Sequence, residues 1–257
     1  MNKDAVNGAR SLYYGLFSKF FIFTSREDRY EGIKEALDVL IKNPLDENSC
    51  EALKEVREFI ELNGTQGLSL EFDKIFHDFD SETLRDTASF YSDGIESGKK
   101  RVEVKNFLAK TKIRRDEKNY KDNEDSIGFL MIFMHELIEL MMKGEKQYET
   151  VQHCLFTEII NEFFDEFIVE LYEHENANTY KSVAIVLNAF LEFERLYFDV
   201  QKPAPKEKPV RKKEDCEFIS DKEAKRRAEN KMKKESDTST DCSIEEVSTG
   251  TEEEGDL

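Results

Sequence analysis

His135, Glu136 and Glu139 are the residues whose types and spacing come closest to a catalytic metal site. They form an H-E-x-x-E sequence, which lacks the second histidine of the H-E-x-x-H zinc motif, so this helix cannot supply two imidazole ligands. No histidine of the chain stands in the E-x-x-H pattern of di-iron helical bundles. The spacing therefore favours a solvated pair on one helix face. A helical metal-dependent hydrolase that uses His135 and Glu139 is the alternative.

Other signatures of catalysis are missing from the sequence. It has no G-x-S-x-G, no P-loop and no G-x-G-x-x-G. The cysteines are widely spaced without a C-x-x-C pair, which predicts neither a disulfide framework nor a thiolate metal site. We expect a protein that is not an enzyme and that needs no cofactor and no metal. The cysteines concerned are Cys50, Cys154, Cys216 and Cys242.

A crowded polar segment, 123–126, precedes the strongest apolar helix of the chain, 127–142. Asp125 or Ser126 can cap this helix by accepting hydrogen bonds from its first backbone N–H groups. Such capping is compatible with a role in binding, and the sequence leaves both interpretations open.

The elements that must position these residues are helices, because apolar residues recur at helical spacing in one segment after another. No segment alternates like a strand, and only one proline, Pro44, occurs before residue 203. The pattern predicts an all-α, compact multi-helix bundle, with an irregular stretch at 89–98 and a charged loop at 113–123. The expected helices lie within 12–21, 30–41, 53–60, 72–79, 104–108, 127–141, 151–171 and 180–197.

Two parts of the chain differ in composition. Residues 1–202 contain the helical segments, whereas 203–257 contain 12 basic and 16 acidic residues and few apolar ones. Such a segment cannot bury enough apolar surface to offset its chain entropy. We expect a helical domain over 1–202 and a disordered charged tail over 203–257, which is either a solvated extension or a partner-binding one.

The formal net charge is −18, of which −14 belongs to residues 1–202. Such a charge repels phosphates and argues against a nucleic-acid partner. No apolar run reaches the 18 or so residues of a membrane span, and the N-terminus lacks the apolar stretch of a signal peptide, so we expect a cytoplasmic protein without stable membrane insertion. Residues 99–121 oppose the trend with ten basic and three acidic residues. This basic window is either a solvated face or a docking surface for an acidic segment or a phosphate.

Two segments carry a resemblance to a known family. They are A-S-F-Y-S-D-G at 88–94 and E-D-S-I-G-F-L-M-I-F-M at 124–134. In this order they resemble the TorD/DmsD/NarJ-type chaperones of molybdoenzyme maturation, and the similarity extends more weakly over about 8–200. Ser126 stands where the family usually has His, and Phe163 or Phe164 stands where it has Trp, since the chain has no Trp.

The resemblance implies an all-helical fold of two linked helical parts and a role in protein maturation. The protein would bind the twin-arginine signal peptide, the body, or both, of a molybdenum- or tungsten-dependent oxidoreductase subunit before cofactor insertion and export. The helix opening looks most similar to the branch that serves formate dehydrogenase. The alternative from another class is a generic helical interaction scaffold. The resemblance and the residue chemistry nominate as partner-binding residues Tyr91, Glu124, Asp125, Ser126, Ile127, Phe129, Leu130, Phe133 and Met134.

A signal peptide has a basic end and an apolar stretch, so its receptor needs an apolar groove rimmed by carboxylates. Phe129, Phe133 and Met134 lie beside Glu124 and Asp125 in one segment. Together with Met131, these residues are expected to supply both the apolar groove and its carboxylates, and Met side chains adapt to varied apolar partners.

Overall fold

Helices form the regular structure of the protein. The computed structural model describes residues 3–24, 27–78 and 83–204, and in those residues the only β-type pairing is an isolated bridge between Thr87 and Ser126. The predicted all-α class is confirmed. The helices are α1 (Lys3–Phe21), α2 (Ile33–Lys42), α3 (Glu47–Phe76), α4 (Ala88–Asp93), α5 (Lys99–Ala109), α6 (Ile127–Met142), α7 (Tyr148–Leu155), α8 (Asn161–Glu173) and α9 (Thr179–Phe198), with a 3₁₀ turn at Glu27–Tyr30 and a π-helical turn at Phe156–Ile160.

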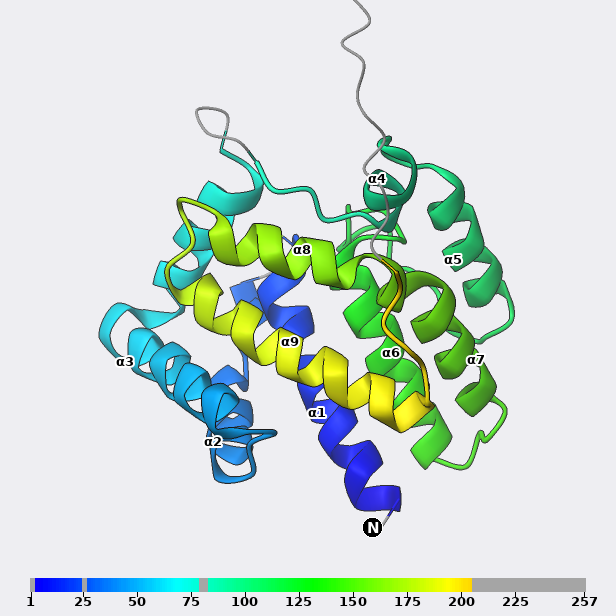
Figure 1. Ribbon diagram of the computed structural model, residues 1–257, viewed down its shortest axis with the longest axis horizontal. Coiled ribbons are helices and arrows are strands. Elements are labelled where there is room, and N and C mark those ends of the chain that lie inside the picture. Colours follow the sequence, from blue (N-terminus) through cyan, green and yellow to red (C-terminus); the bar gives the residue numbers. More distant parts are fainter. Residues whose placement is uncertain (1–2, 25–26, 79–82, 205–257) are drawn as a thin grey trace, which may run out of the picture. The chain divides into compact units, whose positions relative to one another are not determined.

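Helices α1 and α6 form the centre of the fold (Figure 1). They run antiparallel, since Ser11 contacts His135 while Phe21 lies at Gly128. The backbones approach so closely there that a Cβ on Gly128 would lie 2.6 Å from the Phe21 carbonyl oxygen. Only glycine fits this contact.

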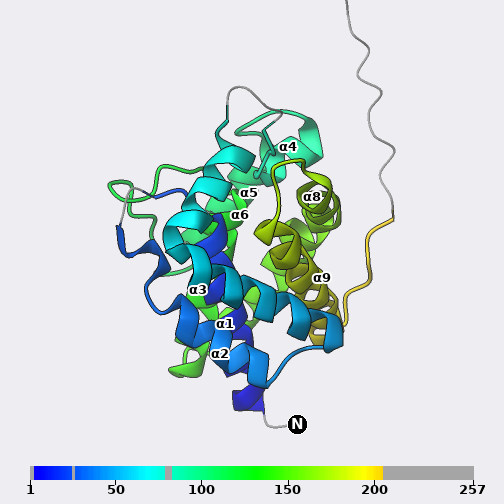
Figure 2. The same cartoon turned by 90° about the vertical axis from the view of Figure 1, so that its left-hand side faces the viewer.

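The remaining helices cover this central pair. Helix α9 packs on both α8 and α3, α2 packs on α3, and α7 packs on α6. Figure 2 shows α2 and α3 together on the side that faces left in Figure 1. Thirteen phenylalanines of the described residues are buried, as expected if the aromatic residues mainly form the core. No helix of the described part has the length and hydropathy needed to cross a membrane.

Helix α3 combines two helices that the sequence predicts separately. The chain breaks at Gly64, whose φ of 68° and ψ of 177° are not helical, and the helix resumes at once. The predicted interruption is therefore real, but it is a kink without a loop, which glycine permits because it has no Cβ. The second of these helices ends at Phe76, three residues before the predicted end at 79.

The predicted irregular stretch at 89–98 is wrong at its start, because Ala88–Asp93 form α4. The predicted helix over 151–171 is correct in extent, but the π-helical turn divides it into α7 and α8. The predicted disordered tail, 203–257, lies outside the described residues from 205 on. The described residues, from 3 to 204, form one compact unit.

Candidate functional site

The N-terminal end of α6 is joined to the start of α4. The Ala88 N–H donates to the Asp125 carbonyl oxygen at 2.9 Å, and the Ile127 N–H donates to the Asp86 carbonyl oxygen at 2.8 Å. The hydroxyl of Ser126 accepts from the Phe129 N–H at 3.3 Å and caps α6. The predicted capping by Ser126 is thus confirmed.

Asp125 caps α4, whereas Ser126 caps α6. The Asp125 side chain is fully buried, and Oδ2 accepts a hydrogen bond at 3.0 Å from the N–H of Ser89 in the first turn of α4. Oδ1 has no hydrogen-bond partner among the described residues. A carboxylate at a helix N-terminus is favourable because the first N–H groups lack intrahelical acceptors. Asp125 therefore positions the A-S-F-Y-S-D-G segment.

Glu124 is bound internally as well. Its carboxylate accepts a hydrogen bond from Arg101 Nε at 2.6 Å and lies 3.6 Å from Arg115 Nε. Although burial disfavours the charged carboxylate, the hydrogen bond from Arg101 and the two positive charges hold the pKa of Glu124 below its ordinary value. Part of the basic window thus neutralises the acidic segment that opens α6.

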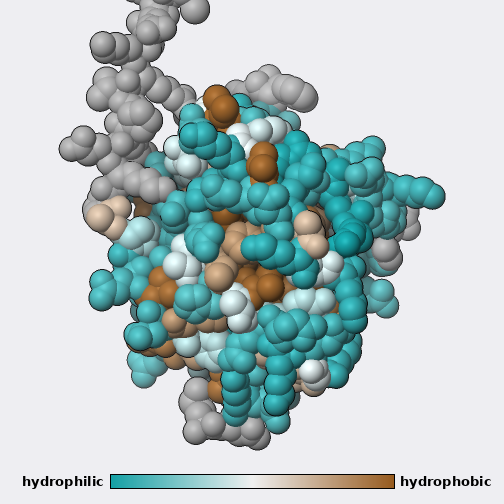
Figure 3. All heavy atoms as spheres, turned by 90° about the vertical axis from the view of Figure 1, so that its right-hand side faces the viewer, coloured by the Kyte–Doolittle hydropathy of each residue, from teal (hydrophilic) through white to brown (hydrophobic). Residues whose placement is uncertain are grey.

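The rest of the basic window divides between internal contacts and solvent. Lys100 Nζ lies 3.1 Å from both Glu103 and Glu162, whereas Lys99 and Lys105 are exposed on α5. Figure 3 shows the right-hand side of Figure 1, where α5 and α7 lie, as a largely hydrophilic face with hydrophobic patches gathered in its middle. The window is therefore both a structural element and a solvated surface.

The apolar partner-binding candidates lie in the interior. They pack in the core along α6, under α1 and its neighbours, so the predicted apolar groove is not present in this structure. An apolar stripe in a sequence does not reveal whether another helix covers it. The exposed fractions are 0% for Ile127, Leu130, Phe133 and Met134, and 7% for Phe129.

Tyr91 connects α4 to α8. Its hydroxyl lies 2.8 Å from Glu170 Oε2 and 3.0 Å from the Arg85 carbonyl oxygen, and its ring stacks on Phe163 with centroids 5.4 Å apart. Burial and the neighbouring Glu170 carboxylate raise the pKa of Tyr91 above its ordinary value. Asp125 thus links α4 to the start of α6, and Tyr91 links α4 to α8.

The H-E-x-x-E residues have a structural role. Ser11 Oγ donates to Glu139 at 2.7 Å, and His135 Nδ1 lies 2.9 Å from both the hydroxyl and the carbonyl oxygen of Ser11. These contacts join α6 to α1. Within the described residues no group of three or more His, Cys, Asp or Glu side chains is arranged to hold a metal ion.

A buried polar network, which the sequence analysis did not identify, joins α1 to α9. Arg10 donates to both carboxylate oxygens of Glu194, at 2.5 and 2.9 Å, and Tyr14 donates to Glu194 at 2.7 Å. Neither the Arg10 nor the Glu194 side chain is exposed to solvent. The one available signal was a glutamate on the apolar face of the last helix.

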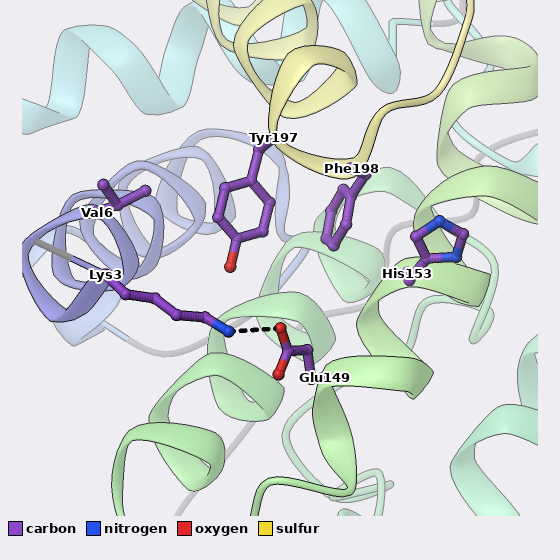
Figure 4. Close-up of a pocket in the computed structure, with 6 residues that line it drawn as sticks. All are labelled: Lys3, Val6, Glu149, His153, Tyr197 and Phe198. Carbon is purple, nitrogen blue, oxygen red and sulfur yellow. Dashed lines mark hydrogen bonds and ion pairs between the residues drawn. The ribbon is translucent and has the colours of Figure 1, made fainter. Parts of the chain in front are cut away.

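This network lies behind a surface cavity of about 420 Å³ formed by α1, α7 and α9. Figure 4 shows the rings of Tyr197 and Phe198 projecting from the end of α9, with an ion pair between Lys3 and Glu149 across the opening. None of the cavity residues was nominated from the sequence. The lining residues are Lys3, Val6, Glu149, His153, Tyr197 and Phe198.

Comparison with known proteins identifies the family. Residues 42–169, about half of the chain, match the sequence model of the nitrate reductase delta subunit family. Residues 42–169 belong to the nitrate reductase delta subunit family. The matched segment begins at the end of α2 and reaches into α8, so it includes the junction between α4 and α6.

No curated protein matches the chain. A crystal structure assigned to a redox enzyme maturation protein from Archaeoglobus fulgidus is similar, with a TM-score of 0.45 and 16% identity over 72% of this chain and 93% of that chain. Proteins of the nitrate reductase delta subunit family are chaperones and not catalysts. The family thus confirms the prediction that the chain is not an enzyme. The formate dehydrogenase branch remains a prediction.

Proposed function

We propose that this protein is a cytoplasmic chaperone for a molybdenum- or tungsten-dependent oxidoreductase subunit. It binds the twin-arginine signal peptide, the body of the subunit, or both, before cofactor insertion and export. The family match over residues 42–169 carries the proposal. Formate dehydrogenase is the client that we propose on the resemblance of the 124–134 segment.

The proposed client-responsive region is the junction between α4 and α6. Asp125 and Tyr91 hold α4 in place, and the exposed Ile95 follows directly after this helix. The formal net charge of −18 suits a basic leader. Because the apolar face of α6 is covered, it contributes to binding by supporting the junction. Direct contact between this face and the leader requires the covering helices to move.

The first test is identification of the protein that co-purifies from the native cell. A molybdenum or tungsten oxidoreductase subunit supports the proposal. For direct binding, the probe is a synthetic 20-residue peptide with two adjacent arginines followed by an apolar segment that contains one Trp. Since this chain has no Trp, the peptide supplies the only Trp emission, and its blue shift reports burial of the apolar segment. We expect a Kd in the micromolar range or so, typical of a transient contact.

Asp125→Ala tests the junction, and Asp125→Asn is its matched control. Alanine removes the acceptor for the Ser89 N–H, whereas asparagine keeps an acceptor oxygen and removes the charge. We expect Asp125→Ala to weaken peptide binding by about tenfold. If Asp125→Asn binds as the wild type does, Asp125 acts by positioning α4; if both variants weaken binding equally, its charge is needed. If the peptide does not bind and no oxidoreductase subunit co-purifies, the proposed function is wrong.

A further inference from the structure

The cavity between α1, α7 and α9 has apolar walls and a charged opening. Val6 and the rings of Tyr197 and Phe198 supply the apolar walls, while Lys3 and Glu149 lie at the opening (Figure 4). A volume of about 420 Å³ exceeds that of any single side chain, so a large apolar side chain can enter together with part of its neighbour.

The walls are held from behind by the buried network. The Arg10 guanidinium carbon lies 3.9 Å from the centroid of the Tyr197 ring and 4.8 Å from that of Phe198. Arg10 is itself fixed by Glu194, and the Tyr197 hydroxyl donates to Asn7 Oδ1 at 3.0 Å. The two rings therefore need little ordering when a ligand arrives, which lowers the entropic cost of binding. Rigid aromatic pockets of this kind are typical binding hot spots.

The ion pair at the opening can be exchanged. Lys3 Nζ lies 2.7 Å from Glu149 Oε1, with 62% and 48% of the two side chains exposed. Exposed pairs of this type contribute little to stability. An incoming guanidinium can replace the lysine, because it binds a carboxylate through two parallel hydrogen bonds whereas an ammonium acts as a point charge.

We propose that this cavity receives one apolar side chain of the client's leader and that Glu149 binds an arginine next to it. This inference rests on the proposed function and assigns it a binding site. Glu149 supplies the negative charge for the arginine, and the walls formed by Val6, Tyr197 and Phe198 supply the apolar surface for its neighbour. Lys3 acts as an internal competitor that occupies Glu149 when no leader is bound.

The cavity lies toward the C-terminal end of α6, because Gln152, between the lining residues of α7, donates to the Leu137 carbonyl oxygen at 3.3 Å. The α4–α6 junction lies at the N-terminal end. This helix has 16 residues and is therefore roughly 24 Å long at about 1.5 Å per residue. An extended peptide of about seven or eight residues covers that distance. A leader of some twenty residues can therefore contact the cavity and the junction at once.

The experiment measures binding of the Trp-containing peptide to the wild-type chain, to three single variants and to a matched control. Glu149→Gln removes the carboxylate, Lys3→Ala removes the internal competitor, and Val6→Trp fills the cavity. Because Val6→Trp adds a second indole, its binding is followed with a fluorescein-labelled peptide. The matched control is the surface pair of Lys112 and Glu145, which lies outside the cavity with its charged atoms 3.1 Å apart. Its residues are changed to Ala and Gln, respectively.

We expect Glu149→Gln to weaken binding about five- to tenfold and Lys3→Ala to strengthen it about two- to threefold, since the two changes act in opposite directions on one carboxylate. Val6→Trp should weaken binding at least tenfold, with an unchanged far-UV circular dichroism spectrum. The control variants should bind as the wild type does. A peptide with two lysines in place of the arginines should lose most of the effect of Glu149→Gln.

The outcomes separate the two proposals. If the peptide binds the wild type but Glu149→Gln and Lys3→Ala match the control variants, the cavity assignment is wrong while leader binding stands. If the peptide fails to bind the wild type, both the cavity assignment and leader binding are wrong. Denaturation of the wild type can also release a bound small molecule. If the Val6→Trp variant releases none and still binds the peptide as the wild type does, the cavity is a small-molecule site instead.

Discussion

Replacing Glu194 by Ala should be among the most destabilising single changes in this protein. The substitution leaves the buried Arg10 guanidinium without a counter-charge, and the remaining acceptors are two neutral amide oxygens, Asn7 Oδ1 at 3.3 Å and Gln152 Oε1 at 3.1 Å. Removal of one partner of a fully buried pair costs about 3–5 kcal/mol. That is a large share of the 5–15 kcal/mol or so that stabilises a typical domain.

The assay is urea unfolding followed by far-UV circular dichroism, with the double variant Arg10→Met/Glu194→Leu as the second measurement. Replacing both charges by apolar groups of similar volume removes the uncompensated charge, so the double variant should be more stable than Glu194→Ala by about 2 kcal/mol or more. Glu145→Ala, which breaks the surface pair with Lys112, should cost less than about 1 kcal/mol. The reasoning fails if Glu194→Ala costs no more than Glu145→Ala.

Two further predictions concern the packing and the charge around α6. Gly128→Ala should lower the free energy of unfolding by about 1–3 kcal/mol or more, because its Cβ would overlap the Phe21 carbonyl. Gly8→Ala on α1 should raise it by about 0.5–1 kcal/mol, because a Cβ there meets nothing within 4 Å. Equal effects of the two variants in urea unfolding would contradict the packing argument. Burial, together with Asp122 and Glu96, raises the pKa of Asp86 to about 7. The unfolded value is near 3.9, so the stabilisation from protonated Asp86 is present below about pH 4 and lost as the pH rises to 7. Asp86→Asn should therefore stabilise the protein relative to wild type more at pH 8 than at pH 5, and a pH-independent difference in urea unfolding would disprove this linkage.

The sequence was informative where structure depends on local periodicity. The apolar spacing of residues 127–141 correctly predicted a helix of that extent, and Ser126 was correctly predicted as a candidate cap. Local patterns could not show that α1 covers this helix, because the contact depends on Gly128 meeting a backbone more than 100 residues earlier. The predicted groove failed for that reason.

The candidate sites differ in how much of each could be predicted from the sequence. Asp125 was nominated, but its partner Ser89 lies 36 residues away, so its role in holding α4 could not be predicted. The cavity residues come from the beginning of α1, from α7 and from the end of α9, and none carries a motif. Only the packed structure places Lys3 beside Glu149.

The π-helical turn at 156–160 bears on how this chain tolerates changes in length. It accommodates one residue more than an α-helical turn does, and it separates α7, which packs on α6, from α8, which packs on α9. A one-residue deletion there can be absorbed as the turn reverts to α-helical geometry. The same deletion in the middle of α9 would rotate half of its buried stripe by about 100°. This turn is therefore a place where the chain can lose a residue without disturbing its core.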